Sequence, residues 1–320
     1  MQLSVSTNSI MNRRDLLKAA SLLPFVGTTP DLVVQTTPAV RTRSVRMAYI
    51  GDTHIMPQRK PVNGVAEAFR HLQNQSDKPA FILHGGDVIM DALSRDKSAV
   101  QKQWDVWQEV VKAECSLPLE YCIGNHDIWG VADAKADTRY GKAWAMEQFG
   151  ITKRYRSFDK NGWHFVVLDS VHPKPDGSWY TGIIDDEQLD WLKKDLQQTD
   201  PNTPVLVLSH IPILSSTVLV FNDRNPAKHP DTQILGSLLH ADSSSLVELL
   251  HKFPNVKAAL SGHTHLLDRV DYNQVSYFCN GAISGNWWNS DTYHETKAGY
   301  ALFDLYTDGT IERTYVAFNA

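Results

Sequence analysis

Five short, largely apolar runs dominate this sequence, because each leads into a Gly or Ser and into residues that carry carboxylate, imidazole or amide groups. The runs lack polar and apolar alternation, which is typical of strands buried on both faces of an α/β sheet. Ligands bind beyond the carboxyl ends of such strands, so we expect the polar segments to form one polynuclear site. These segments are Asp52-Thr53-His54, Gly86-Asp87, Gly124-Asn125-His126-Asp127, Ser209-His210 and Gly262-His263-Thr264-His265.

Length and composition limit the number of domains and the classes of function that this chain can have. The chain has 320 residues and is 42% hydrophobic, enough for one large α/β domain or two smaller ones. Its formal net charge of −5 leaves no basic footprint, so we expect no nucleic acid partner; a nuclease is disfavoured because it would need a basic groove. Cys115, Cys122 and Cys279 lack CxxC spacing, and we interpret them as buried or half-buried thiols.

The N-terminal segment has a pattern of its own. Asn12-Arg13-Arg14-Asp15-Leu16-Leu17-Lys18 precedes a short, weakly apolar stretch at 19–27, and together they resemble a bacterial twin-arginine export signal. The stretch is too short for a stable membrane span, which needs about 20 residues. We therefore expect residues 1–44 to be an export signal and linker read by the twin-arginine export machinery, and the protein to be periplasmic or otherwise extracytoplasmic.

Hydrophobic periodicity predicts how the strands are connected, within a folded domain that we expect at 45–320. Apolar residues at helical spacing and capping signals predict helices over 62–75, 95–114, 138–149 and 186–198. Asn161-Gly162 predicts a hairpin between strands at 155–158 and 163–168. The remaining strands are predicted at 267–272, 275–279, 299–306 and 311–318.

One long segment without a clear period follows His210. Residues 211–241 are rich in Pro and polar side chains, and a loop of this length inside a compact domain is usually functional or disordered. We interpret it as a lid beside the site, with Arg224 as a contact for an anionic substrate. The alternative is a surface insertion that touches no substrate.

A second such segment, residues 281–298, is interpreted as a loop that lines the cleft. It contains the adjacent Trp287 and Trp288, and then His294. Neighbouring side chains on an extended backbone point to opposite sides, so the two tryptophans cannot both fill one face of the core. We expect one of them to line the cleft, with His294 as a further substrate contact.

The five polar segments, in this order and at strand ends, resemble the motif blocks of the calcineurin-like metallophosphoesterases. The resemblance covers at least residues 45–265. It implies a four-layer α/β/β/α sandwich in which two mixed β-sheets are flanked by helices, with a binuclear metal centre in the crevice at the strand ends. It also implies that Asp52, His54 and His265 hold one ion and Asn125, His210 and His263 the other, with Asp87 bridging.

The implied ligands suit the implied chemistry. Nitrogen and oxygen donors without thiolate favour two divalent or mixed-valence ions of Mn, Fe or Zn. Water held between such ions loses a proton, and the resulting hydroxide attacks phosphorus in line. The resemblance places His126 toward the leaving group, as a general acid or electrostatic stabiliser, and it assigns Asp127 to orient the ring of His126.

We therefore expect a metal-dependent hydrolase of phosphoric esters. Small organic phosphodiesters or nucleotide-type substrates are favoured, with an aryl or nucleotide group stacked on Trp287 or Trp288. A phosphomonoesterase is the alternative, because it would share the same ligand set. A metal-free scaffold on this fold is disfavoured, since no motif residue is missing.

Overall fold

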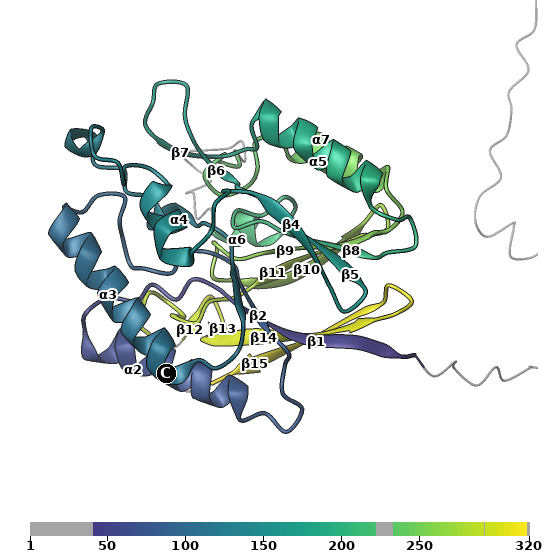
Figure 1. The fold of residues 1–320 in the computed structure, drawn as a ribbon, viewed down its shortest axis with the longest axis horizontal. Helices are drawn as coiled ribbons and strands as arrows, with labels where there is room; N and C mark the ends of the chain where they lie inside the picture. Colours follow the sequence, from purple (N-terminus) through teal and green to yellow (C-terminus); the bar gives the residue numbers. More distant parts are fainter. Residues whose placement is uncertain (1–40, 222–232, 291, 319–320) are drawn as a thin grey trace, which may run out of the picture. The chain divides into compact units, whose positions relative to one another are not determined.

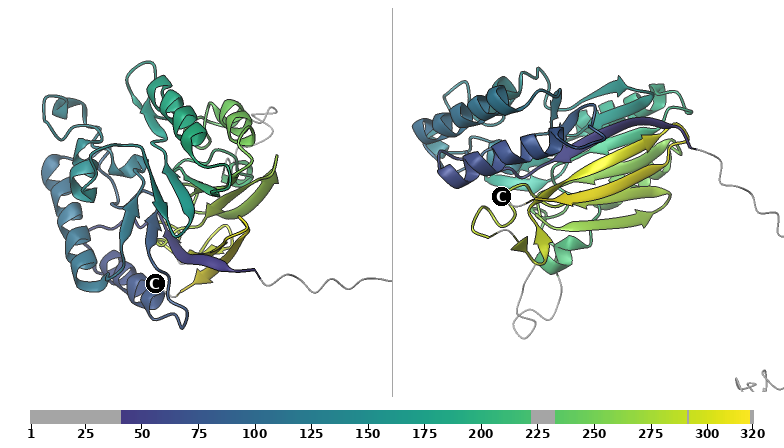
Figure 2. Two further views of the ribbon diagram at one scale, coloured as in Figure 1. Left: turned by 45° about the vertical axis from the view of Figure 1, so that its right-hand side comes forward. Right: turned by 90° about the horizontal axis from the view of Figure 1, so that it is seen from below.

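Two β-sheets stack face to face, and helices cover the outer face of each sheet (Figures 1 and 2). The structure is a computed structural model that describes residues 41–221, 233–290 and 292–318. One cluster of buried apolar side chains fills the space between the sheets, and one more lies under the helices on each side. The predicted four-layer α/β/β/α sandwich with two mixed sheets is therefore confirmed.

The first sheet holds three of the five predicted strand ends. Its order is β15-β14-β1-β2-β3, in which β1, β2 and β3 are parallel and β14 and β15 are antiparallel to their neighbours. Its strands are β1 (Arg43–Ile50), β2 (Ile82–His84), β3 (Leu119–Tyr121), β14 (Gly299–Tyr306) and β15 (Ile311–Ala317).

The second sheet holds the other two strand ends. Its order is β10-β11-β9-β8-β5-β4, and β5, β8, β9 and β11 run parallel. In the predicted turn between β4 and β5, Asn161 and Gly162 both have positive φ, as a tight hairpin turn requires. Its strands are β4 (Arg156–Lys160), β5 (Trp163–Val167), β8 (Val205–Leu208), β9 (Val256–Ser261), β10 (Leu267–Tyr272) and β11 (Val275–Asn280).

Strand β1 shows why the layers form. Side chains alternate between the faces of a strand, so its apolar run supplies both cores at once. Met47 and Tyr49 lie in the cluster between the sheets, whereas Ala48 and Ile50 lie in the cluster beneath helices α2 (Arg59–Gln73) and α3 (Lys97–Glu114). All four side chains are buried, which fixes the register of β1 and the position of the polar residues that follow it.

The helices lie where periodicity predicts them, with one shorter than predicted. The helix expected at 138–149 begins only at Ala143, because Gly141 has a φ of 69°, which a helix cannot include. Helices α2, α3 and α4 pack on the first sheet and α5 and α7 on the second. The helices are α2 (Arg59–Gln73), α3 (Lys97–Glu114), α4 (Ala143–Phe149), α5 (Asp186–Gln198), α6 (Thr217–Phe221) and α7 (Ser243–His251).

Several short elements were not predicted from the sequence. Strands β6 (Val171–Pro173) and β7 (Trp179–Gly182) form a separate hairpin, and β12 (Thr292–Tyr293) pairs with β13 (Thr296–Lys297). Helices α6 and α7 were likewise missed. Within the described ranges, no helix has the length and apolarity needed to cross a bilayer, and the three cysteines are free thiols, as expected.

Candidate metal centre

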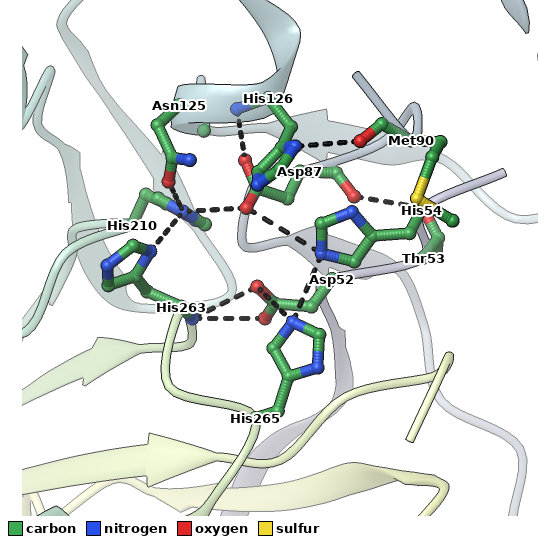
Figure 3. Close-up of polar contacts among 12 residues, drawn as sticks. Asp52, Thr53, His54, Asp87, Met90, Asn125, His126, His210, His263 and His265 are labelled. Carbon is green, nitrogen blue, oxygen red and sulfur yellow. Dashed lines mark hydrogen bonds and ion pairs between the residues drawn. The ribbon is translucent and has the colours of Figure 1, made fainter. Parts of the chain in front are cut away.

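The polar segments that follow β1, β2, β3, β8 and β9 meet at one place, as Figure 3 shows. Their ligand atoms form groups in which all atoms lie within 4.8 Å of one another. Six of the seven predicted metal ligands belong to these groups, and the seventh, Asn125, lies 3.0 Å from His210; each of the seven is at least nine-tenths buried. The seven are Asp52, His54, Asp87, Asn125, His210, His263 and His265.

The first cluster consists of Asp52, His54 and His265. The Nε2 atoms of His54 and His265 face each other at 3.1 Å, and Nε2 of His265 lies 3.6 Å from Oδ1 of Asp52. The other ring nitrogen of His265, Nδ1, donates to the carbonyl of Gly285 over 2.7 Å. That bond leaves Nε2 as the unprotonated nitrogen of a neutral His265 ring.

The second cluster contains Asn125, His210 and His263. Nε2 of His210 lies 3.0 Å from Oδ1 of Asn125 and 3.2 Å from Nδ1 of His263. The outer nitrogens of both rings donate to backbone carbonyls: His210 to Gly85 over 2.8 Å, and His263 to Ser237 over 2.7 Å. In the neutral form of each ring, these bonds leave the inward-facing nitrogen as the acceptor.

Asp87 lies between the two clusters. Its Oδ2 is 3.2 Å from Nε2 of His210 and 3.8 Å from Nε2 of His54. Its Oδ1 accepts a hydrogen bond of 2.8 Å from the backbone N–H of His126, which holds the carboxylate in place. The carboxylate is thus positioned to reach ions in both clusters, as the bridging assignment requires.

The donor set fits a pair of cations. Nε2 of His210, Nδ1 of His263 and Oδ1 of Asn125 converge although the other nitrogen of each ring donates to a backbone carbonyl, an arrangement that a cation stabilises, either a proton on His210 or a metal ion. Burial lowers the pKa of His263 to about 3 and that of His265 to about 4, which keeps both rings neutral as ligands must be. Nitrogen and oxygen donors without thiolate suit Mn, Fe or Zn.

His210 differs from the other two rings. Burial disfavours its cation, but the adjacent carboxylate of Asp87 reverses this effect and raises the pKa of His210 to about 9. Without a metal, the two side chains therefore form a buried ion pair. A metal ion in the second cluster would take the place of the proton on His210, so ion binding and proton release are linked there.

The backbone at the site adopts a conformation that side chains usually avoid. Five of the seven ligands have φ between 43° and 70°, in the left-handed region that favours glycine. Such strain costs of order 1–3 kcal/mol per residue and is concentrated at functional sites. Packing of the apolar strands on both sides of the loops compensates for it. The five residues are Asp52, His54, Asp87, His263 and His265.

Two glycines next to ligands are needed for close approach. A Cβ atom at Gly262 would lie 2.3 Å from Oδ2 of Asp52, and one at Gly124 would lie 2.1 Å from Oδ1 of Asp87. Both distances are too short for real contacts, and the second would also meet the backbone nitrogen of Asp87. Glycine at these two positions lets the loops of different strands pack against the carboxylates.

His126 borders the site. Its ring stands edge-on to that of His54, with 4.7 Å between the centroids, and a ring nitrogen lies close to His54 and Asp87. Nδ1 donates to the carbonyl of Met90 over 2.7 Å. Nε2 is therefore the ring nitrogen available to a bound substrate, which agrees with a role at the leaving group.

The role predicted for Asp127 is corrected by the structure. Its carboxylate accepts backbone hydrogen bonds of 2.8–2.9 Å from Asp87, Val88 and Gly124 rather than from the ring of His126, whose Nδ1 bonds to Met90. The carbonyl of Met90 orients the ring of His126 instead, and Asp127 ties the loop after β2 to the loop after β3.

A pocket of about 440 Å³ opens over these residues. Trp287 forms one wall and stacks on His265 with 4.1 Å between ring centroids. Tyr180, on β7, forms another wall and stands edge-on to His263 with 6.0 Å between centroids. Leu235 and Leu238 supply apolar surface at the rim, so the part of the predicted 211–241 lid that the structure describes does border the site.

Two of the predicted substrate contacts that the structure describes, Trp288 and His294, do not line this pocket. Trp288 is only 6% exposed, and its Nε1 donates to the carbonyls of Thr53 and His54, so it belongs to the core and supports the first cluster from below. Both tryptophans have positive φ, so the backbone is not extended as assumed. His294 is exposed and contacts Tyr293, and Arg224 lies outside the described residues.

Sequence reasoning missed Tyr180 as part of the site. Tyr180 belongs to the β6–β7 hairpin, whose two strands are too short to show alternation. The available signal was Pro175-Asp176-Gly177 between them, a turn sequence in which Gly177 has a φ of 79°. Asp169, which also follows a strand, pairs with Lys142 and Arg154 and belongs to none of the ligand groups.

Two adjacent clusters of nitrogen and oxygen ligands at the strand ends of a two-sheet sandwich define a binuclear metallohydrolase. Residues 45–267 match the calcineurin-like phosphoesterase family, and the chain belongs to that family. It is a metal-dependent hydrolase of phosphoric esters.

Relatives with named activities cover most of the chain. It is 27% identical to a 3',5'-cyclic-nucleotide phosphodiesterase of Nostoc over 83% of this chain and 90% of that protein. It is 24% identical to a 3',5'-cyclic adenosine monophosphate phosphodiesterase of Escherichia coli, over 86% and 90%. A dimetal phosphatase from Danio rerio shares the fold, with a TM-score of 0.60, 15% identity, and coverage of 87% of this chain and all of that one.

Proposed function

We propose that the protein is a phosphodiesterase that acts on small organic diesters, including nucleotide-type diesters. The observation that carries this proposal is the stacking of Trp287 on His265, which sets an aromatic wall directly beside the metal ligands. Cyclic-nucleotide phosphodiesterases among the relatives support it, because their similarity extends over more than four-fifths of the chain. A nucleobase or aryl group on that wall would bring its phosphate to the two clusters.

Different residues of the site bind the substrate and transfer the proton. Bound cations would supply an activated water and neutralise charge on the phosphoryl group. Trp287 and Tyr180 hold the organic part of the substrate and exclude water from the pocket. His126, fixed through its Nδ1 by Met90, presents Nε2 to the leaving oxygen and donates a proton or stabilises negative charge there.

Mn, Fe or Zn is proposed for both clusters. The support is the chemistry of the ligands, since imidazole, carboxylate and amide oxygen without sulfur suit ions of intermediate hardness. The two clusters differ in composition, because the first has one carboxylate with two imidazoles and the second has an amide oxygen with two imidazoles. Different metals in the two clusters are therefore part of the proposal.

Assays of chelator-stripped protein test the function. We expect hydrolysis after addition of Mn, Fe, Zn or Ni, with bis-aryl phosphate and 3',5'-cyclic AMP turned over faster than mono-aryl phosphate. Faster turnover of the monoester would establish the alternative, a phosphomonoesterase. Absence of hydrolysis of every substrate with every metal would contradict the proposal as a whole.

We also propose that the protein is exported by the twin-arginine machinery. The support is the paired Arg13-Arg14, followed by Leu16-Leu17 and Lys18. That route carries folded proteins, which suits an enzyme whose ions are bound by buried residues from distant strands. Replacing Arg13 and Arg14 by Lys is expected to leave the protein in the cytoplasm of a bacterial host. Export of that variant at the wild-type level would contradict the proposal.

A further inference from the structure

The hydrogen bond that His263 makes through the ring nitrogen facing away from the centre differs from those of His210 and His265 in where its acceptor lies in the chain. Gly85, which accepts from His210, directly follows β2, and Gly285, which accepts from His265, is itself buried. Ser237, which accepts from His263, belongs instead to the 235–241 loop. This loop contains no strand or helix and also borders the substrate pocket.

Contacts with one strand hold the 235–241 loop in place. The N–H of Gly182, at the end of β7, donates to the carbonyl of Gly236, and the N–H of Ala241 donates to the carbonyl of Gly182 over 2.7 Å. The C-terminal part of the loop is held through Nε2 of His240, which lies 3.0 Å from Oγ of Ser209. The carbonyl of Ser237 is therefore held in position by contacts that the loop makes on both sides of this residue.

Gly236 packs too tightly against β7 to accept a side chain. A Cβ atom there would lie 2.6 Å from Oγ1 of Thr181, whereas the next atom, Cβ of Ala241, would be 3.6 Å away. The φ of Gly236 lies outside the left-handed region, so alanine would not strain the backbone. The hydroxyl of Thr181 is therefore the main obstacle to a side chain at position 236.

We propose that the 235–241 loop is a positioning element for the second metal ion. By accepting from Nε2 of His263, the carbonyl of Ser237 keeps Nδ1 unprotonated and fixes the plane of the ring toward His210 and Asn125. The first cluster makes no use of this loop, since His265 is oriented by Gly285. Displacing the loop therefore lowers the affinity for the second ion and leaves the affinity for the first ion unchanged.

This inference rests on the proposed assignment of His263 to the second ion, and metal titration tests it. Chelator-stripped protein is titrated with Mn²⁺, and the affinities of the two ions are measured by calorimetry. In Gly236→Ala, and more strongly in Gly236→Val, the added side chain pushes the loop from Thr181. We expect one of the two affinities to fall by roughly 10- to 100-fold, the range known for changes in outer-shell partners, while the other stays at its wild-type value.

A compensating variant separates loop position from general damage. Thr181→Ala removes the obstructing hydroxyl, so we expect Thr181→Ala/Gly236→Ala to regain most of the lost affinity, and Thr181→Ala alone to bind both ions as the wild type does. Unchanged affinities in both Gly236 variants would overturn the inference, as would equal weakening of both ions without rescue. Should Gly236→Val fail to fold, Gly236→Ala and its rescue decide the matter. A wild-type protein that binds fewer than two Mn²⁺ ions would instead overturn the assignment of two sites itself.

Discussion

Trp287 lies against the imidazole of His265, with 4.1 Å between ring centroids and 29° between the planes. Tyr180, near His263, also lines the pocket, so an aromatic ring lies next to a ligand of each proposed ion. A substrate with an aromatic group can therefore stack beside the ligands without displacing any of them.

Removing the indole of Trp287 is expected to weaken substrate binding more than turnover. Trp287→Ala should raise KM for a nucleotide or aryl diester roughly tenfold or more, because stacking of a base on an aromatic side chain contributes roughly 1–3 kcal/mol. Trp287→Phe should keep part of this binding. Steady-state kinetics with a dialkyl diester provide the control, and an equal rise in KM for that substrate would contradict stacking.

Asp87 serves both clusters, so its loss should affect both ions. Asp87→Asn removes the negative charge that lies 3.2 Å from His210 and 3.8 Å from His54, and we expect loss of both metals and of nearly all turnover. Metal content per chain, measured by elemental analysis, checks this. Asp133→Asn, at an exposed position, is the matched control. Wild-type metal content in Asp87→Asn would exclude the bridging role.

His126 should matter for chemistry but not for metal content. His126→Ala is expected to keep both ions and to slow hydrolysis roughly 100- to 10,000-fold, most for esters with poor leaving groups, because the leaving oxygen then lacks its proton donor. A series of esters with leaving groups of different pKa measures this dependence. A rate for alkyl esters equal to that of the wild type would remove His126 from the mechanism.

Asp127 should behave as a structural residue. Asp127→Asn places amide hydrogens against the backbone N–H groups of Asp87, Val88 and Gly124, each of which now donates to the carboxylate. We expect unfolding to become easier by roughly 1–3 kcal/mol, with weaker metal retention. The leaving-group dependence should keep its wild-type slope, and a slope like that of His126→Ala would restore the original assignment of Asp127.

His164 supports a pH-dependent contribution to stability far from the metals. Burial alone would lower its pKa, but hydrogen bonds to Asp195 and Asp159, of 2.9 and 2.6 Å, raise the pKa above 6.5. A raised pKa in the folded state stabilises the protein below the unfolded value, and this contribution is lost as pH rises through the folded value.

Urea unfolding of the wild type and of His164→Gln, measured from below the unfolded pKa of histidine to above its folded pKa, tests this contribution to stability. The wild type should be more stable by roughly 1–3 kcal/mol below about pH 6, since both hydrogen bonds then involve a charged ring. The difference should shrink toward alkaline pH. A difference that grew with pH would mean that His164 is neutral in the folded state.

The metal ligands could be predicted because each follows a strand whose apolar run is continuous. Asp52, Asp87, His210 and His263 come to one place for the same reason, since the strands before them share an edge of the sandwich. The fold followed from the same runs and from helical spacing. Adjacency in the sequence was a poorer guide to which side chains contact each other. Asp127 is adjacent to His126 in sequence, but its carboxylate binds backbone N–H groups instead.

The rest of the site depends on segments with no periodic signal. Tyr180 and Ser237 reach the pocket from a short hairpin and an irregular loop, and only the contacts of Gly182 with Gly236 and Ala241 bring them together. Trp288 was misplaced because its backbone is left-handed rather than extended. Such turns are set by distant packing, which no local pattern reveals.

Strand β1 lies between β2 and β14 in the first sheet, although β14 comes from the far end of the described chain. Asp52 and His54 follow β1, so their geometry depends on pairing with a strand that lies far away in the sequence. Long-range pairing of this kind is slow to form. We therefore expect the first cluster to reach its ion-binding geometry late in folding, after β14 has joined β1.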